Sequence, residues 1–419
     1  MHKNIWILQT GEPLQIDDGF RPMRCINLSS ELVKQGHKVT IWSSAFSHQT
    51  KMHRSNSFKV VEINKNLTIN LIPSYGYKKN IGIARLFDHL LLAWNLRKAL
   101  KTNNFSIPDI AFIGYPPIET AFVLGRWLEK RNVPFIVDLK DQWPHLFLEI
   151  FPTVLKPFLS IILFPYFWAG KKSLNMATGF TSMSEGYIDW MKTFSGDSDK
   201  PFFIAPLTTR PLSHDQDIIS HDQQIDWLSI HQIDSKLVNR FCFVGTFMSV
   251  FDFIPLRDAM RELNSLGYQY EVVLCGEGGY LPGVKNMMSE FDNVIFTGWI
   301  NEPQVKLIYK LSKASIIPYK NIDNYKINIP NKVVDAFANG RPIIATLEGQ
   351  IDELCKEYNV GFSCFPGSKM SLSMAMIELL KNHTLCSQMQ ENARHLYDKK
   401  FSFEQVYSGL SEFILQKSH

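Results

Sequence analysis

Short apolar runs alternate with amphipathic segments along the first half of the chain. Runs of five or six apolar residues are typical of buried strands, whereas apolar side chains at helical spacing indicate helices packed on a sheet. The predicted strands are residues 4–9, 38–42, 110–114 and 135–138, and the predicted helices are residues 22–35 and 118–131. Gly36 suits the left-handed position that ends a helix. Strand, helix and strand in this order predict parallel βαβ units.

A second alternating series begins near residue 240. Its predicted strands are residues 241–245, 271–275, 294–296, 314–318 and 342–346, and its predicted helices are residues 255–266, 304–313, 331–339, 370–381, 384–400 and 403–417. The stretch 195–239 between the two series is polar and rich in turn formers, as linkers and surface insertions are.

The pattern predicts an α/β protein with two Rossmann-like, doubly wound parallel-sheet domains that face a cleft. The expected divisions are an acceptor domain over 1–200, a linker or insertion over 201–239, a donor-binding domain over 240–400, and a helix over 401–419 that packs back on the first domain. A length of 419 residues agrees with this, because it is too long for one ordinary core.

Composition excludes some classes of protein. Charged residues make up 20% of the chain and the net charge is only +4, so nothing demands a nucleic-acid partner, and we expect none. The six cysteines form no CxxC pair, which favours free thiols in a reducing compartment. No basic segment followed by an apolar one opens the chain, so we expect a cytoplasmic protein.

The most hydrophobic stretch is residues 158–170, which Lys171 and Lys172 follow. Prolines interrupt it, and it is shorter than the ~20 apolar residues that cross a bilayer. Two interpretations stay open. The stretch is a buried helix, or it is an interfacial helix that lies on a membrane with its lysines toward lipid phosphates.

Glycine-rich and charged loops fall where strands end, which is where parallel sheets bind ligands. Gly276-Glu277-Gly278-Gly279 follows a predicted strand. Glycines there could bring backbone amides close to a phosphate, but a tight turn explains them equally well. The run lacks the GxGxxG spacing of a dinucleotide site.

Pro330 predicts the start of a helix in which Lys332 and Asp335 share one face. A lysine in the first turn can reach a diphosphate at the helix N-terminus, and an aspartate one turn later can accept hydrogen bonds from ribose hydroxyls. The alternative is an ordinary surface Lys–Asp pair.

Asp138, Lys140 and Asp141 follow the strand 135–138. Asp141 could accept a proton or orient a sugar hydroxyl, although helix capping and a local ion pair are the simpler explanation. The loop after the first strand, residues 11–24, could close over a ligand, and its Arg21 and Arg24 could bind phosphate or carboxylate. Asp17-Asp18 and the triplet 197–199 only superficially suggest metal ligands, and we expect no metal.

The order of these motifs resembles glycosyltransferase family four, the large retaining group with the GT-B fold, over nearly the whole chain. The residues that carry the resemblance are Gly11, Arg24, Leu32 to Val39 around Gly36-His37, Asp141 to Pro144, Ser184-Glu185, Phe243 to Thr246 with Gly245, Leu274 to Gly278, Phe296 to Gly298 and Pro330 to Pro342. The resemblance is strongest to bacterial transferases of capsule, O-antigen, lipopolysaccharide or exopolysaccharide assembly.

The resemblance implies a role for individual residues. Gly11 would approach the donor sugar or phosphate, Lys332 would bind the diphosphate, and Asp335 would bind the ribose. Asp141 would lie near the transferred sugar or the acceptor hydroxyl, which makes Asp141 and Lys332 the candidate catalytic residues. The other candidate donor-binding residues are Arg24, Gly245, Gly276, Gly278, Asn328, and the backbone at Trp299 and Ile300, which would hold the nucleobase.

The chain departs from the family pattern at two places. The first of two glutamates that the family often carries would fall on Ile327, so a neighbour such as Asn328 would replace it. The family's lysine after the glycine turn is also missing, since residues 247–252 hold no base. The diphosphate would then depend on Lys332, helix amides, and Arg210 or Lys326.

The sequence therefore predicts a retaining glycosyltransferase that moves a sugar from a nucleoside-diphosphate sugar to a glycan or polyprenyl-linked acceptor. It would work without metal or other cofactor, in the cytoplasm or peripherally at the inner face of the plasma membrane. The alternatives are a nucleotide-sugar epimerase of the same fold, and a non-catalytic binder of sugars or nucleotides.

Overall fold

The computed structural model describes residues 2–418 apart from 19, 21, 79–81, 150, 151, 153, 154, 197, 198 and 209–220. Arg21, Arg210 and two residues of the triplet 197–199 therefore lie outside the described residues. The chain divides into two compact units. The first unit comprises Met1–Ala205 with Tyr407–His419, and the second unit comprises Pro206–Val406.

The first unit holds an eight-stranded sheet of order β3-β4-β2-β1-β5-β6-β7-β8. The strands are β1 (Asn4–Leu8), β2 (Lys38–Ser44), β3 (Lys59–Asn64), β4 (Leu67–Ile72), β5 (Ile110–Tyr115), β6 (Phe135–Leu139), β7 (Gly179–Ser182) and β8 (Phe202–Ile204). All neighbours pair in parallel except β3, which joins β4 as an antiparallel edge strand. The first predicted strands are confirmed, and the β3–β4 hairpin is an addition.

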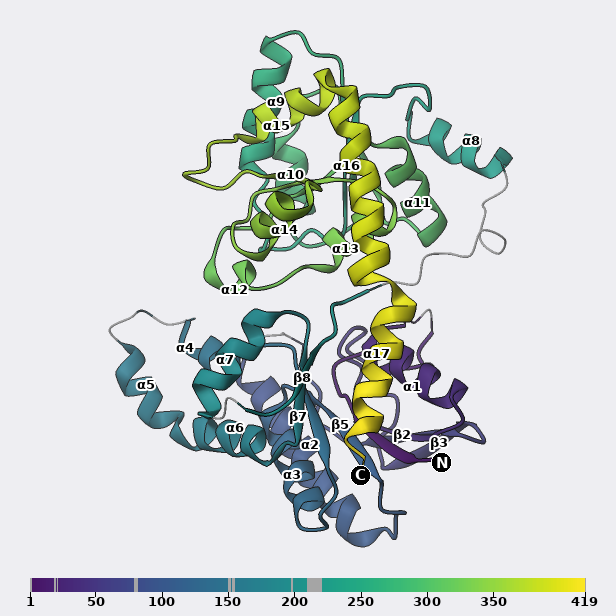
Figure 1. Cartoon of the computed structure of the whole chain (residues 1–419), viewed down its shortest axis with the longest axis vertical. Helices are drawn as coiled ribbons and strands as arrows, with labels where there is room; N and C mark the ends of the chain where they lie inside the picture. Colours follow the sequence, from purple (N-terminus) through teal and green to yellow (C-terminus); the bar gives the residue numbers. More distant parts are fainter. Residues whose placement is uncertain are drawn as a thin grey trace. The chain divides into compact units, whose positions relative to one another are not determined.

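Helices cover both faces of this sheet (Figure 1). They are α1 (Arg24–Lys34), α2 (Ile83–Thr102), α3 (Ile118–Glu129), α4 (His145–Glu149), α5 (Lys156–Ile162), α6 (Phe164–Met176) and α7 (Glu185–Ser195). Helix α3 packs against α2 and α6 in one layer. Helix α17 (Phe403–Gln416), yellow in Figure 1, lies beside α1, where Asn27 Nδ2 donates to Tyr407 Oη at 3.3 Å. Residues 407–419 thus belong to the first unit.

The second unit holds a six-stranded parallel sheet of order β11-β10-β9-β12-β13-β14. The strands are β9 (Arg240–Val244), β10 (Glu271–Cys275), β11 (Val294–Gly298), β12 (Ala314–Ile317), β13 (Ile343–Ala345) and β14 (Gly361–Ser363). The helices are α8 (His221–Ile230), α9 (Ile254–Ser265), α10 (Leu281–Met287), α11 (Glu302–Leu311), α12 (Asp323–Lys326), α13 (Asn331–Ala338), α14 (Gln350–Tyr358), α15 (Leu372–Lys381) and α16 (His383–Leu396), which the π-helical turn η2 (Tyr397–Phe401) extends. The predicted α/β fold with two mainly parallel sheets is confirmed.

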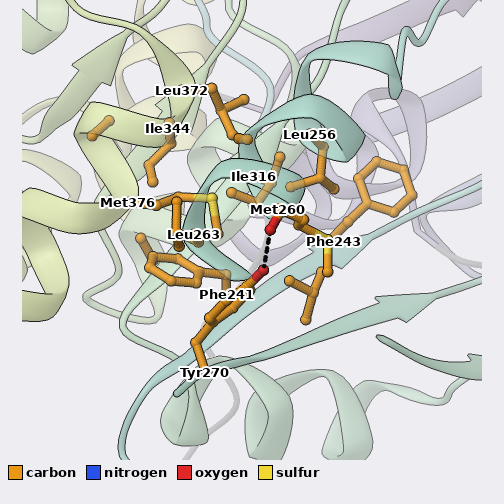
Figure 2. Close-up of a cluster of buried hydrophobic side chains, with 14 of the residues drawn as sticks. Phe241, Phe243, Leu256, Met260, Leu263, Tyr270, Ile316, Ile344, Leu372 and Met376 are labelled. Atoms are coloured by element: carbon orange, nitrogen blue, oxygen red, sulfur yellow. Dashed lines mark hydrogen bonds between the residues drawn. The ribbon is translucent and has the colours of Figure 1, made fainter. Parts of the chain in front are cut away.

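Alternating side chains of the strands build a separate core on each face of this sheet. Phe241 and Phe243 of β9 point into one core with Leu256 and Met260 of α9, and Tyr270 Oη donates to Met260 O at 3.1 Å there (Figure 2). Cys242, between the two phenylalanines, belongs to the core on the other face. This period of two is what a strand buried on both faces requires.

A buried ion pair fastens the stretch before β9 to the sheet. Arg240 is fully buried and pairs with Glu271, the first residue of β10. Its guanidinium also donates to Asp234 O at 2.7 Å and to Leu311 O at 3.2 Å. The stretch 201–239, which we expected to be a linker or insertion, thus contributes β8 to the first sheet. Its end, around Asp234, is held to the second sheet by Arg240.

The hydrophobic stretch 158–170 forms α5 and the start of α6, and it is not buried. Phe158 is 65% exposed, Ile161 is 74% exposed and Phe164 is 64% exposed. The buried-helix interpretation is therefore wrong for these side chains, because α5 packs no residue into the core of the first unit. No helix within the described part of the chain has the length and apolarity needed to cross a membrane.

Candidate active site

The strand order of the second unit reverses at β9, which lies between β10 and β12. Open α/β sheets bind ligands beyond the carboxyl ends of the strands at such a reversal. The loops after β9, β10 and β11 and the start of α13 meet there. This edge of the sheet is therefore where the predicted donor residues have to lie.

Backbone hydrogen bonds join the three loops in register. Gly245 N donates to Cys275 O at 2.9 Å, Phe247 N donates to Glu277 O at 2.8 Å, and Gly276 N donates to Gly298 O at 2.7 Å. We call these loops, residues 245–247, 276–278 and 298, the glycine platform. The platform is made of backbone, so its shape depends little on side chains.

Two glycines of the platform are required by close packing. A Cβ atom on Gly276 would lie 2.1 Å from Gly245 O, and one on Gly278 would lie 2.3 Å from Phe247 O. Both residues also have positive φ, +126° and +148°, which side chains rarely tolerate. The Gly276–Gly279 run thus serves a tight backbone turn, one of its two predicted interpretations.

Lys332 lies against the platform from the first turn of α13. Its Nζ donates to Val244 O at 3.0 Å and lies 5.1 Å from the ring centre of Phe243 and 5.2 Å from that of Phe251. A Cβ atom on Gly245 would lie 1.5 Å from this nitrogen. Gly245 therefore provides the space for the ammonium group, and the structure brings these two predicted residues together.

Asp335 lies one turn beyond Lys332 on α13, and its backbone O accepts from Asn339 Nδ2 at 2.7 Å. Trp299 follows the platform directly and is 70% exposed, whereas the Ile300 side chain is buried in the core. Only the backbone of Ile300 is thus available to a ligand. Asn328 Oδ1 is buried and accepts no hydrogen bond from any described residue, which leaves an acceptor for a ligand hydroxyl or amide.

Lys326 is a poor substitute for the missing family lysine. Its Nζ lies 2.9 Å from Glu348 Oε1 and 3.1 Å from Asp323 Oδ1. These hydrogen-bonded carboxylates, Glu348 first, raise the pKa of Lys326. Its charge is already balanced by two carboxylates, so we leave it out of the proposed donor site.

The first unit has its own pocket, of about 220 Å³, where its strand order reverses between β1 and β5. Gly11 and Asp141, two of the predicted site residues, both line it. The other side chains that bring polar or aromatic groups to it are Gln9, Thr10, Glu12, Ser44, Phe46, His48, Tyr77, Arg85, Asp88, His89 and Lys140. The two candidate catalytic residues thus belong to different units, Asp141 to the first and Lys332 to the second.

Helix α2 supplies pocket residues that the sequence analysis missed. Arg85, Asp88 and His89 line the pocket from one face of this helix, as their i, i+3, i+4 spacing requires. The Arg85 guanidinium lies 5.2 Å from the ring centre of Trp143. Asp88 accepts a hydrogen bond from Gly76 N at 2.6 Å. The helical spacing of these polar residues was the signal available in the sequence.

Both pocket histidines are neutral at neutral pH. Burial, followed by the charges of Lys51 and Arg85, lowers the pKa of His48 to about 4. Burial, followed by Arg85 and His48, lowers the pKa of His89 to about 3. Each ring can therefore accept a hydrogen bond through one of its nitrogens.

Asp141, which follows β6, differs from Asp138 within that strand. Burial raises the pKa of its carboxyl group to about 6, against the opposing charges of Arg85 and Lys140. Asp138, by contrast, is fully buried between Arg24 Nη1 at 3.3 Å and Thr181 Oγ1 at 2.8 Å. Asp138 thus connects α1 to β7 through its hydrogen bonds, whereas Asp141 lines the pocket and changes its protonation state near pH 6.

The expected phosphate-binding role of Arg24 does not fit its surroundings. Its side chain is 2% exposed, and it donates to Asp138 and to Ala205 O. Lys140 forms an ion pair with Glu12. Burial alone would raise the pKa of Glu12, but Lys140, the Cys25 N–H and Arg24 together lower it. Arg24 thus belongs to a buried ionic network, and we leave it out of the proposed donor site.

Asp17 of the acidic pair Asp17-Asp18 has a structural explanation as well. Arg54 Nη2 lies 2.6 Å from Asp17 Oδ2. Among the residues with a described placement, no group of three or more His, Cys, Asp or Glu side chains is arranged to hold a metal ion.

Residues 231–396 match the family model of glycosyl transferases group 1. This segment corresponds to most of the second unit, including the glycine platform and α13. No curated protein matches the chain.

Solved structures with the same fold cover nearly the whole chain. Sucrose-phosphate synthase from Thermosynechococcus elongatus is 14% identical with a TM-score of 0.71, over 99% of each chain. Anabaena HepE in complex with UDP-glucose is 12% identical with a TM-score of 0.64, over 99% of this chain and 100% of that one. WaaG, a glycosyltransferase involved in lipopolysaccharide biosynthesis, is 12% identical with a TM-score of 0.59, over 98% and 99%.

The fold is therefore the GT-B fold of glycosyltransferases, as predicted. The group 1 domain in the second unit bears out the prediction of an enzyme of the glycosyltransferase class.

We predict that Gly276→Ala lowers the free energy of unfolding by at least ~2 kcal/mol, because the new Cβ has to displace the backbone of the neighbouring loop. Gly283→Ala is the matched control. Its Cβ would meet nothing within 4 Å, so in α10 it should stabilise by about 0.5–1 kcal/mol. Urea unfolding of both variants measures the difference, and equal stabilities would contradict the packing of the platform.

Proposed function

We propose that the protein is a retaining glycosyltransferase of family four that transfers a sugar from a nucleoside-diphosphate sugar to an acceptor hydroxyl. The observation that carries this proposal is the Lys332 ammonium group, which α13 holds against the glycine platform at the reversal of the strand order. A cation beside a helix N-terminus and close-packed backbone suits a diphosphate.

In the proposed donor site, Lys332 and the first amides of α13 bind the diphosphate, and Asp335 accepts hydrogen bonds from the ribose. The exposed Trp299 and the Ile300 backbone lie next to the nucleobase. Asn328 Oδ1 accepts from a donor hydroxyl, which would satisfy its buried and unpaired oxygen. HepE, of the same fold, was solved with UDP-glucose, and this supports a nucleotide-sugar donor.

The proposed chemistry follows from where charge develops. The bond between the anomeric carbon and the diphosphate oxygen breaks, and the acceptor oxygen bonds to that carbon on the same face. Negative charge grows on the leaving diphosphate, so a fixed cation and amide dipoles stabilise the transition state more than the ground state. Lys332 supplies this cation, and the leaving phosphate takes the acceptor proton. We expect no metal to be required.

The pocket of the first unit suits the acceptor. Its aromatic rings, carboxylates and neutral histidines are groups that bind sugars. Asp141 orients the attacking hydroxyl, and Gly11, which has no side chain, leaves space for the ligand at the pocket wall. A separate acceptor pocket favours a transferase over an epimerase, because an epimerase acts on the nucleotide sugar alone.

We further propose a role in bacterial surface polysaccharide assembly at the inner face of the plasma membrane. The exposed apolar side chains of α5 and α6 precede two exposed lysines, Lys171 and Lys172. Apolar groups beside cations suit an anionic lipid surface, where a polyprenyl-linked acceptor would lie. The similarity in fold to WaaG, which acts in lipopolysaccharide biosynthesis, supports this role.

Lys332→Ala should lower donor turnover at least ~100-fold, because it removes the cation that balances the leaving group. Asp335→Ala should lower it less, about tenfold or more, through weaker donor binding. Lys356→Ala is the control, since this lysine is 73% exposed on α14. The assay follows release of nucleoside diphosphate from a panel of nucleotide sugars, and wild-type turnover in both variants would contradict the donor site.

The pH dependence of kcat/KM for the acceptor should follow the ionisation of Asp141. Its carboxyl group, with a pKa of about 6, is ionised above that pH, and below it the group loses its capacity to accept the hydrogen bond that orients the attacking hydroxyl. We therefore expect kcat/KM for the acceptor to fall about tenfold per pH unit below 6. Asp141→Asn should remove this acid limb and lower the plateau, whereas Asp18→Asn should retain both. An unchanged limb in Asp141→Asn would refute the assignment.

Membrane contact is testable by co-sedimentation with vesicles that contain anionic lipid. Replacing Phe158 and Ile161 together by Ser should weaken binding more than tenfold, because burying each apolar side chain contributes about 1.5–3 kcal/mol. Ile230→Ser, at a 75% exposed site in the second unit, should not change it. Equal binding by the double variant and wild type would exclude this surface.

A further inference from the structure

A second pocket of the second unit, of about 330 Å³, lies at the opposite edge of its sheet from the glycine platform. Lys313 directly precedes β12, and Arg341 precedes β13 by two residues, so both lie at the amino ends of these strands. The end of α11, the start of α16 and the segment before β9 complete the wall. No part of the proposed donor or acceptor chemistry uses this pocket.

The lining of this pocket is positively charged. Lys310, Lys313 and Arg341 contribute to it together with His383, and none of its lining residues is acidic. Three cations without a carboxylate in one concave surface are unusual in a chain whose charges nearly balance. The pocket therefore favours a negatively charged ligand.

Lys313 is the most informative of these cations because it is only 5% exposed. Its Nζ lies 3.2 Å from His383 Nδ1, and no described carboxylate forms an ion pair with it. A buried ammonium group without a counter-ion loses much of its hydration free energy, and an anion in the pocket restores it. The lysine thus points to a ligand rather than to a structural ion pair.

Arg341 is held in position by backbone oxygens. Its Nη1 donates to Ser312 O at 3.1 Å and its Nε donates to Asn339 O at 3.3 Å. Among the described residues it also lacks a carboxylate partner. Its fixed guanidinium retains donors that can bind two oxygens of one anion.

Helix α16 adds its N-terminus to the same wall. The helix has 14 residues and begins at His383, where the Asn382 side chain accepts from Leu385 N at 3.0 Å. The first amides of a helix have no partner within it, and Ser387 lines the pocket one turn after His383. Helix dipole and amide donors favour an anion at this end.

We infer that this pocket is an anion site that binds a phosphate group, with Lys313 and Arg341 as its principal ligands and the start of α16 as its amide donor. Phosphate matches it because three or four oxygens can accept from a guanidinium, an ammonium group and helix amides at once. The volume leaves room for a small molecule that carries the phosphate, so free phosphate and a sugar phosphate are the two sources to distinguish.

Titration calorimetry with inorganic phosphate and with glucose 6-phosphate, at constant ionic strength, tests this inference. We expect saturable binding to the full chain, and binding unchanged in Lys332→Ala, which disables the proposed donor site. Failure of the proposed function would appear as unchanged turnover in that variant and would leave phosphate binding intact. Tighter binding of glucose 6-phosphate would identify a phosphorylated sugar as the ligand, and equal binding would identify free phosphate.

Lys313→Met should weaken phosphate binding at least tenfold. The variant should fold, since it replaces a buried cation by an apolar side chain of similar length. Lys310→Glu, at the exposed rim, should weaken binding without touching the core, whereas Lys399→Glu makes the same charge change at an exposed residue outside the pocket and should not. Absence of binding to the wild type, or equal affinity in Lys313→Met, Lys310→Glu and wild type, would overturn the inference.

Discussion

The space left at Gly245 decides how the candidate donor site is built. The Lys332 ammonium group lies where a Cβ atom on this glycine would be, 1.5 Å from the ideal position. Any other residue at 245 would drive the lysine away from Val244 O and from the two phenylalanine rings beside it. The absence of a Cβ atom at Gly245 thus sets the position of Lys332, the only cation in the first turn of α13, against the glycine platform.

The carboxylates around β6 in the first unit differ in their surroundings. Asp138 and Glu12 have cations in direct contact, Arg24 and Lys140, and stay in the buried network. Asp141 directly follows Lys140, but burial outweighs that cation and raises the pKa of Asp141 to about 6. Two acids that stand three residues apart in the sequence therefore have different surroundings: Asp138 is buried against Arg24, and Asp141 lines the pocket.

Much of the fold could be predicted because the local pattern determines it. The residues 271–275 are apolar enough to be read directly as a strand, and Gly36 ends α1 with a φ of +88° as its position predicts. The platform glycines directly follow predicted strands, and Lys332 follows Pro330 at a predicted helix start, so both could be located from the sequence.

The remainder of the site depends on contacts between distant segments. Arg24 meets Asp138 across 114 residues, and no local pattern shows that this arginine is buried. Helix α2 was missed because its apolar residues surround it rather than form one stripe, which leaves Ile83, Phe87 and Trp94 exposed. The pocket residues Arg85, Asp88 and His89 on α2 were therefore missed as well. The exposure of residues 158–164 was equally invisible, since an apolar run alone does not say what covers it.

Because main-chain hydrogen bonds hold the glycine platform together, the exposed side chains around it are not needed to keep the loops in place. The side chains of Met248 and Trp299 beside the platform, and of Glu277 within it, are all exposed, so each can be replaced without breaking these hydrogen bonds. Such an arrangement lets these side chains vary over evolutionary time while the backbone of the platform stays the same. Variation among relatives should therefore concentrate at these three positions and spare Gly245, Gly276 and Gly278.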